Sequence, residues 1–464
     1  MLSKTATRTL HRFGVRVNRF KLTRKAHIRG ALLNDGRVAA AVREHAREHG
    51  LSEINVWRRV NAYIDEIVPY FNILAYYRLG YPASRIVLNL LYKVSVDYAD
   101  LRALDALPGD SAVIYLSNHR SNADYVLLGY ALAGDVSISY AVGEWARAFP
   151  LEYVFKSFGS YFIRRRFREP LYHTVLERYV QLVTVNGVTQ GIFPEGGLTR
   201  DGTLRPAKIG LLDYMLGAAR EDPGLAQRLT IIPVALNYDR VLEDRTLLRE
   251  LGRQQGENTT PRLTQLREVA RYVGWNLARL TTGRWKRYGR AAVTFGAPIR
   301  LAPWLEAQRT DGANLWSLPK TDRLARVQAL ADDVMTRIGA LIPVTPVPLA
   351  CAAIQSFDGD FIPRQALLGR MAEMRDALVE LNAKVLRADR SIEETFDRAY
   401  RMLAMRRILV AEGTGFAVMP RQRPLVRYYA NSIVHLLGPF AGGIRERDGV
   451  EIERASVGEL GTRN

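Results

Sequence analysis

In the middle of the chain, short apolar runs alternate with longer amphipathic stretches. The apolar runs have the length of buried strands and fall at 112–116, 136–142, 159–163, 190–194, 230–237 and 291–296. The spacing of apolar residues between them predicts helices near 123–133, 169–186 and 208–220. Such alternation is typical of an α/β fold with a mainly parallel sheet flanked by helices. Ligand sites in these sheets lie where strands end and loops begin.

Both ends of the chain are predicted to be additional helical regions. We expect a basic, membrane-associating N-terminal region over 1–100, an α/β domain over 101–310 and a mostly helical C-terminal region over 311–464. The expected C-terminal helices span 320–340, 364–388 and 391–411. The uncharged stretch 338–357 contains three prolines. Because proline interrupts a helix, we expect this stretch to be a buried extended crossing and not a membrane span.

The charge of the chain points to an anionic partner. It has 66 Lys and Arg against 47 Asp and Glu, a net charge of +19. Nucleic acid, an acidic membrane surface and phosphorylated substrates all fit this surplus. No nucleic-acid-binding module is recognisable, so we expect no nucleic-acid partner. The single cysteine, Cys351, excludes an internal disulfide and a multi-cysteine metal site.

The first 30 residues carry nine Lys or Arg and no acidic residue. At helical spacing, Leu10, Phe13, Val17 and Phe20 share one face, opposite a face of arginines. A basic amphipathic helix of this kind binds to anionic lipid. A solvated tail or a helix docked on the protein remains an equal alternative.

The strongest candidate chemistry lies in the loop after the first predicted strand. His119 falls in this loop, and Asp124 falls five residues later in the first turn of the next helix. A carboxylate on one imidazole nitrogen fixes the tautomer and leaves the other nitrogen to accept a proton. The pair is therefore a candidate general base for a hydroxyl group. The alternative is a satisfied loop histidine beside an aspartate that stabilises the helix N-terminus.

Two further strands end in residues suited to anions and hydroxyl groups. Arg164 and Arg165 end the strand at 159–163, and guanidinium binds phosphate through paired hydrogen bonds. Glu195, followed by Gly196 and Gly197, ends the strand at 190–194. A carboxylate can hold a substrate hydroxyl, and glycines allow the backbone to approach a ligand closely.

Thr199, Arg200 and Lys208 follow the glycines and add a hydroxyl and two cations. Pro233 interrupts the strand at 230–237. Because proline has no N–H to donate to a ladder, we expect Pro233 at a sheet edge, a strand start or a bulge. Taken singly, these features also fit a tight turn and a solvated basic surface.

These four stretches, in this order, resemble the four motifs of the glycerolipid acyltransferase superfamily, and in particular its glycerol-3-phosphate acyltransferase family. The matching stretches are His119 to Asp124, Phe162-Ile163-Arg164-Arg165, Pro194-Glu195-Gly196-Gly197 with Thr199-Arg200, and Ile232-Pro233-Val234. The resemblance is strong over 105–240. Leu198 departs from it, because a polar residue often follows the glycines in the family.

The resemblance implies acyl transfer from acyl-CoA or acyl carrier protein to the sn-1 hydroxyl of glycerol 3-phosphate, giving lysophosphatidate. It implies His119 as the base and Asp124 as its orienting group. Arg164, Arg165 and Arg200 are candidates for the phosphate, with Lys208 in reserve. Glu195 and Gly196 would position the glycerol, and Pro233 would shape the acyl-donor side. No metal or other cofactor is implied.

Two alternatives remain open. The acceptor could be lysophosphatidate or dihydroxyacetone phosphate. The chain could also be a non-catalytic, basic membrane- or nucleic-acid-binding protein that has kept the fold. With the enzymatic function we expect a peripheral protein on the cytoplasmic side of the cell membrane, in contact with an anionic membrane surface.

Overall fold

The computed structural model describes residues 25–70, 80–132, 138–143, 155–156, 159–164, 167–254, 287–309 and 314–442. Eight strands of this part form one sheet: β1 (Lys93–Tyr98), β2 (Ala112–Ser117), β3 (Ser139–Gly143), β4 (Tyr161–Ile163), β5 (Gln190–Ile192), β6 (Leu229–Tyr238), β7 (Arg290–Phe295) and β8 (Ile299–Arg300). The strand order is β1-β7-β6-β2-β5-β3-β4, and β8 pairs with β6. Strands β7 and β8 run antiparallel to β6, whereas the other pairs are parallel. The predicted α/β class with a mainly parallel sheet is confirmed.

Helices flank this sheet. In the part of the sheet domain that the structure describes they are α6 (Tyr81–Leu91), α7 (Leu101–Asp105), α8 (Asp124–Leu132), α10 (Pro170–Val185), α11 (Gly210–Glu221), α12 (Pro223–Arg228), α13 (Asp244–Gln254) and α15 (Leu301–Ala307). The central strands β2 and β6 are buried along their whole length. Strands covered on both faces read as continuous apolar runs, which is why the sequence identified them.

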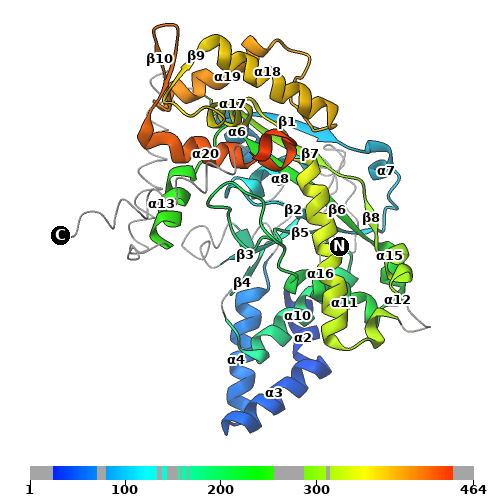
Figure 1. Ribbon diagram of the computed structural model, residues 1–464. Helices are drawn as coiled ribbons and strands as arrows, with labels where there is room; N and C mark the ends of the chain where they lie inside the picture. Colours follow the sequence, from blue (N-terminus) through cyan, green and yellow to red (C-terminus); the bar gives the residue numbers. More distant parts are fainter. Residues whose placement is uncertain are drawn as a thin grey trace, which may run out of the picture.

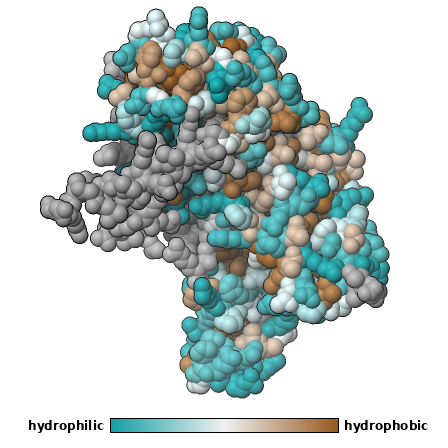
Figure 2. All heavy atoms as spheres, viewed as in Figure 1, coloured by the Kyte–Doolittle hydropathy of each residue, from teal (hydrophilic) through white to brown (hydrophobic). Residues whose placement is uncertain are grey.

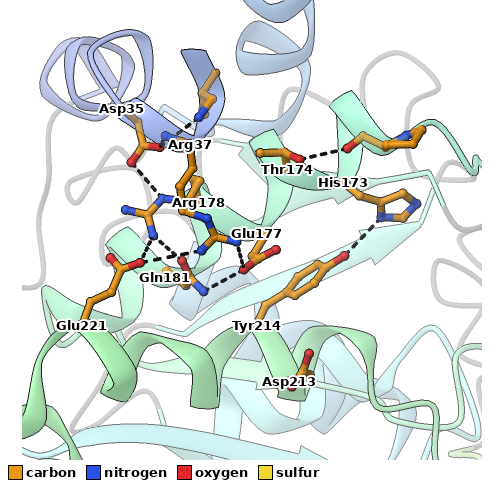
Figure 3. Close-up of polar contacts among 12 residues, drawn as sticks. Asp35, Arg37, His173, Thr174, Glu177, Arg178, Gln181, Asp213, Tyr214 and Glu221 are labelled. Carbon is orange, nitrogen blue, oxygen red and sulfur yellow. Dashed lines mark hydrogen bonds and ion pairs between the residues drawn. The ribbon is translucent and has the colours of Figure 1, made fainter. Parts of the chain in front are cut away.

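Three N-terminal helices pack against α10: α2 (Lys25–Leu33), α3 (Gly36–His49) and α4 (Glu53–Ile67). Figure 1 shows them together at one end of the molecule, and Figure 2 shows that mostly hydrophilic side chains cover this end. A polar network joins α3 to α10 and α11 (Figure 3). In it, Arg178 lies 2.8 Å from Asp35 and 2.6 Å from Glu221. Asp35 also caps α3, because its side chain accepts the N–H groups of Arg37 and Val38.

The C-terminal region is mostly helical, as predicted. It contains α16 (Lys320–Leu341), α17 (Pro346–Gln355), α18 (Arg364–Glu380), α19 (Ile392–Met405) and α20 (Arg423–Asn431), and a small sheet of β9 (Phe361–Pro363), β10 (Leu409–Glu412) and β11 (Gly415–Val418). Figure 1 shows α17 to α20 at the end of the molecule opposite α2 to α4. The proposed division at residues 100 and 310 stays a prediction.

The expected extended crossing at 338–357 is wrong, because most of it is helical. Helix α16 continues to Leu341, and α17 begins at Pro346. Pro346 and Pro348 lie in the first turn of α17, where backbone N–H groups have no acceptor within the helix. Proline therefore starts this helix instead of interrupting it, and all ten residues of α17 are buried.

Two other C-terminal helices end earlier than predicted. Helix α18 stops at Glu380, and Asn382 follows with a φ of 57°. Helix α19 stops at Met405, and Arg407 follows with a φ of 52°. Left-handed backbone ends a right-handed helix. The chain then continues as β10, where the apolar pattern had predicted helix.

Pro233 lies neither at a sheet edge nor at a strand start. It sits inside β6, beside Leu116 of the parallel strand β2. On its other side β6 pairs with β8 before this point and with β7 after it. The Pro233 carbonyl accepts from the Gly296 N–H at 2.8 Å, so the ring nitrogen also faces the link between β7 and β8. Pro233, which has no backbone N–H, therefore lies at the point where the neighbour of β6 changes from β8 to β7.

The helix predicted around Leu10, Phe13, Val17 and Phe20 lies outside the described residues, as does Arg165. Within the described ranges, no helix is long and apolar enough to cross a membrane.

Candidate active site

His119 and Asp124 lie together at the end of β2. Strand β2 ends at Ser117, and α8 begins at Asp124. The His119 Nδ1 atom lies 2.9 Å from Asp124 Oδ2, and the two residues are 1% and 0% exposed. A carboxylate only accepts hydrogen bonds, so Nδ1 carries the proton and Nε2 is the basic nitrogen of the neutral ring. The ring stacks on Phe193 with centroids 4.0 Å apart, which fixes its plane.

Asn118 holds the start of this loop against β6. Its side-chain amide donates to the Leu236 carbonyl at 3.0 Å, and its oxygen accepts the Leu236 N–H at 2.8 Å. The side chain thereby replaces the backbone partner that β6 loses where β2 ends. The loop thus leaves the sheet in a defined direction.

Glu195 reaches the same loop from the end of β5. One oxygen accepts the His119 N–H at 2.7 Å, and the other accepts the Arg205 N–H at 3.1 Å. The residue is 3% exposed. Burial raises the pKa of Glu195 to about 7, although the two backbone hydrogen bonds and the nearby Arg120 act to lower it.

The turn after Glu195 brings Gly196 under Lys208. Gly196 has a φ of 71°, and a Cβ built there would lie 2.8 Å from Lys208 Cδ and 3.2 Å from its Nζ. The Lys208 N–H donates to the Pro194 carbonyl at 2.8 Å. Gly196 and Gly197 are partly exposed, and Lys208 is exposed. Glycine thus lets a cationic side chain cross this turn at the surface.

Thr199 and Arg200 have different surroundings. The Thr199 N–H donates to the His119 carbonyl at 3.1 Å, and its hydroxyl donates to Asp201 at 3.0 Å. Arg200 instead lies 3.3 Å from Glu250 of α13. Thr199 therefore contacts the loop of His119, whereas Arg200 points toward α13.

Arg164 lies against the N-terminal helix α4. Its guanidinium donates to both oxygens of Glu66, at 2.8 and 2.6 Å. The guanidinium carbon also lies 4.9 Å from the ring centre of Phe167 and 5.7 Å from that of Tyr172. The hydrogen bonds to Glu66 raise the pKa of Arg164 above its ordinary value. The hydrogen bonds to Glu66 anchor Arg164, a residue of the second of the four matching stretches, to α4.

Two residues that the sequence did not single out also contact the loop. Tyr238, at the end of β6, donates its hydroxyl to Asp124 Oδ1 at 2.5 Å. Glu243 accepts the Ser121 hydroxyl at 2.7 Å and the Asn122 N–H at 3.3 Å. Burial raises the pKa of Glu243 to about 7. No local pattern in the sequence distinguishes Glu243 from a surface residue.

Comparisons with known proteins find acyltransferase relatives over most of the chain. Residues 99–237 match the family model described as acyltransferase, and residues 274–441 match that of the glycerol-3-phosphate acyltransferase C-terminal region. The chain is 29% identical over 424 residues to the glycerol-3-phosphate acyltransferase of Aeromonas hydrophila, covering 87% of this chain and 49% of that protein. It is 27% identical over 439 residues to that of Pseudoalteromonas atlantica, covering 89% and 50%.

Among solved structures, the 1-acyl-sn-glycerophosphate (LPA) acyltransferase of Thermotoga maritima matches with a TM-score of 0.30 and 17% identity, covering 57% of this chain and 78% of that one. The fold assignment rests on the sheet of this protein and not on that likeness. The chain spans about half the length of the curated relatives it matches. Through its two family-model matches and these relatives, the chain is similar to glycerol-3-phosphate acyltransferases over most of its length.

Proposed function

We propose that this chain transfers an acyl group from acyl-CoA or acyl carrier protein to the sn-1 hydroxyl of glycerol 3-phosphate, giving lysophosphatidate for phospholipid synthesis. The observation that carries the proposal is the His119–Asp124 pair, with 2.9 Å between Nδ1 and Oδ2, at a strand end where Glu195 also converges. The similarity to glycerol-3-phosphate acyltransferases supports the choice of acceptor.

In this reaction His119 Nε2 takes the proton of the acceptor hydroxyl while its oxygen attacks the thioester carbonyl carbon. Asp124 stabilises the imidazolium that forms, because it lies on the opposite ring nitrogen. When the tetrahedral intermediate collapses, the carbon–sulfur bond breaks and the imidazolium returns the proton to the leaving thiolate. The acyl group passes directly to the alcohol, with no acyl-enzyme.

The acceptor is held by the turn that follows Glu195. Each carboxylate oxygen of Glu195 has a second lone pair that can accept a glycerol hydroxyl beside its backbone donor. Within the described part of the chain Lys208 makes no ion pair, so its ammonium group is the first candidate for the phosphate. Arg200, Arg164 and Arg165 remain candidates, although the first two have carboxylate partners. Gly197 and Thr199 would shape this turn, and Pro233 would shape the acyl-donor side.

The site would work at a membrane surface, because the product is a lipid. The net charge of +19 favours peripheral attachment to an anionic, cytoplasmic membrane face. Residues 1–100 would form the membrane-associating region, 101–310 the acyltransferase domain and 311–464 the helical C-terminal region.

The test is an acceptor panel with labelled acyl-CoA and acyl carrier protein as donors. Glycerol 3-phosphate, dihydroxyacetone phosphate and lysophosphatidate are offered at equal concentration. We expect glycerol 3-phosphate to be acylated fastest, and a faster reaction with either other acceptor would reassign the substrate. RNA binding with no transfer to any acceptor would favour the non-catalytic alternative.

His119→Ala tests the role of the imidazole, with His173→Ala as the matched control. The His173 ring lies on α10 and bonds to the Phe167 carbonyl and to Tyr214. We expect His119→Ala to abolish transfer while the circular dichroism spectrum and Tm stay close to those of the control. Full activity in His119→Ala would refute the mechanism.

A further inference from the structure

We propose that the segment from Tyr238, the last residue of β6, to Glu243 positions the catalytic loop, with Tyr238 holding Asp124 and Glu243 holding Ser121 and Asn122. This inference rests on the proposed acyl transfer and assigns two positioning residues to it. Neither residue belongs to the stretches that the family resemblance assigns to catalysis or to substrate binding.

The loop needs such support because its backbone has no regular partner. Four consecutive N–H groups donate to carboxylates: His119 to Glu195 at 2.7 Å, Arg120 to Asp124 at 2.7 Å, Ser121 to Asp124 at 3.0 Å and Asn122 to Glu243 at 3.3 Å. Buried N–H groups require acceptors, and here three carboxyl groups supply all four. The path of the loop therefore depends on where Asp124, Glu195 and Glu243 lie.

Tyr238 completes the surroundings of Asp124. Asp124 Oδ2 already accepts from the His119 ring and from two backbone N–H groups. The Tyr238 hydroxyl is the donor to the other oxygen, Oδ1, and both residues are fully buried. This bond fixes the rotation of the carboxylate and withdraws some of its negative charge from the imidazole. Tyr238 therefore acts on His119 through Asp124.

Glu243 holds the far side of the loop. It accepts the Ser121 hydroxyl at 2.7 Å, and the same hydroxyl oxygen accepts the Ala123 N–H at 3.1 Å. The Ser121 carbonyl accepts the Asp124 N–H at 3.0 Å. Glu243 thus fixes the turn that delivers Asp124 to the first position of α8.

The C-terminal helices hold this segment in place. Asp244, next to Glu243, accepts from both terminal nitrogens of Arg406, at 2.6 and 2.9 Å, and also from the Tyr429 hydroxyl. Tyr429 in turn accepts the Val241 N–H at 3.1 Å. Arg406 follows α19 directly, and Tyr429 lies on α20. The C-terminal region therefore reaches the catalytic loop through residues 238–244.

Tyr238→Phe tests this inference, with Tyr92→Phe as its matched control. Both side chains are fully buried and their rings lie 5.5 Å apart, but the Tyr92 hydroxyl donates to the Arg240 carbonyl at 2.8 Å. The same atom is removed from both variants, and only Tyr238→Phe loses a bond to Asp124. The pKa of His119 is read by NMR on full-length protein labelled at the histidine ring carbons, with its signal assigned by its loss in His119→Asn.

Without the tyrosine hydroxyl, Asp124 directs more of its charge at the imidazole, which favours the protonated ring. We expect the His119 pKa to rise by about one unit in Tyr238→Phe and to stay within about 0.2 units of wild type in Tyr92→Phe. The acid limb of kcat/KM should shift in the same direction, while the KM for the acceptor stays unchanged. An unchanged His119 pKa in Tyr238→Phe, or an equal rise in both variants, would overturn the role of Tyr238.

A double-mutant cycle tests Glu243. If Glu243 acts through Ser121, Ser121→Ala and Glu243→Gln together lower kcat no further than the more severe single change. Losses that multiply independently would overturn this role. A wild-type protein that transfers no acyl group would refute the proposed function. The NMR titration does not require turnover, so it would still decide whether Tyr238 acts on His119.

Discussion

Replacing Glu195 by Gln removes an ionisable group that the fold holds at a pKa of about 7, against an ordinary value of 4.5. The cause is burial, since the residue is 3% exposed and the backbone bonds from His119 and Arg205 offset only part of the cost. The amide is close in size to the carboxyl group but does not titrate. The pH dependence that disappears in the variant therefore belongs to Glu195.

The size of this change in stability follows from the pKa of Glu195 in the unfolded chain and in the folded protein. Between pH 4.5 and about 7 the folded protein binds this proton more tightly than the unfolded chain does. The stabilisation is fully present below pH 4.5 and is lost as the pH rises to about 7. With 1.36 kcal/mol per pKa unit, the shift corresponds to about 3 kcal/mol. The free energy of unfolding of wild type minus that of Glu195→Gln should fall by this amount across the window.

The assay is urea unfolding between pH 4.5 and 8, followed by both tryptophan fluorescence and circular dichroism. Values are compared only where the two probes give the same transition, which is a requirement for two-state treatment. The control is Glu373→Gln, because Glu373 is an exposed side chain of α18 that pairs with Arg370 at the surface. The free energy of unfolding of wild type minus that of Glu373→Gln should vary by less than about 0.5 kcal/mol over the same pH range.

We expect a constant offset in the free energy of unfolding between wild type and Glu195→Gln, because the amide has one acceptor oxygen for two backbone donors. The test is therefore how the difference in this free energy changes with pH, and not its absolute size. A difference that is flat with pH, or one that rises with pH, would show that burial does not raise the pKa of Glu195 in the folded protein.

Three further changes test the site and its support. Asp124→Asn keeps the shape of the side chain but removes the charge 2.9 Å from the imidazole. At an effective dielectric constant of about 20 this interaction is worth about 6 kcal/mol, so kcat should fall about ten-thousandfold, and a loss below tenfold in single-turnover assays would contradict it. Gly202→Ala would place a Cβ 1.9 Å from the Tyr428 carbonyl oxygen at a φ of 87°, and calorimetry should show a Tm lower by about 4 °C. Gly210→Ala, whose Cβ would meet nothing within 4 Å, should leave the Tm nearly unchanged. Lys208→Ala should raise the KM for glycerol 3-phosphate about tenfold with little change in kcat, and an unchanged KM in steady-state assays would assign the phosphate to another cation.

The elements that the sequence predicted well are those whose burial is uniform. Strands β2, β6 and β7 are buried along their length, and α10, α11 and α16 have a regular apolar face, so local pattern alone identified them. The His119–Asp124 pair was also accessible to local reasoning, because one loop and one helix turn bring the two side chains together.

The sequence by itself thus determined the fold class, six of the eight strands of the sheet and the loop that holds the candidate base, since these depend on residues close together in the chain. It missed β1 and β8. Only the tertiary structure decided the partners of that loop. Tyr238 reaches Asp124 across 114 residues, Arg164 reaches Glu66 across 98, and Arg406 reaches Asp244 across 162. No local periodicity records such contacts, because packing, and not spacing along the chain, sets which distant carboxylates and donors meet in a buried site.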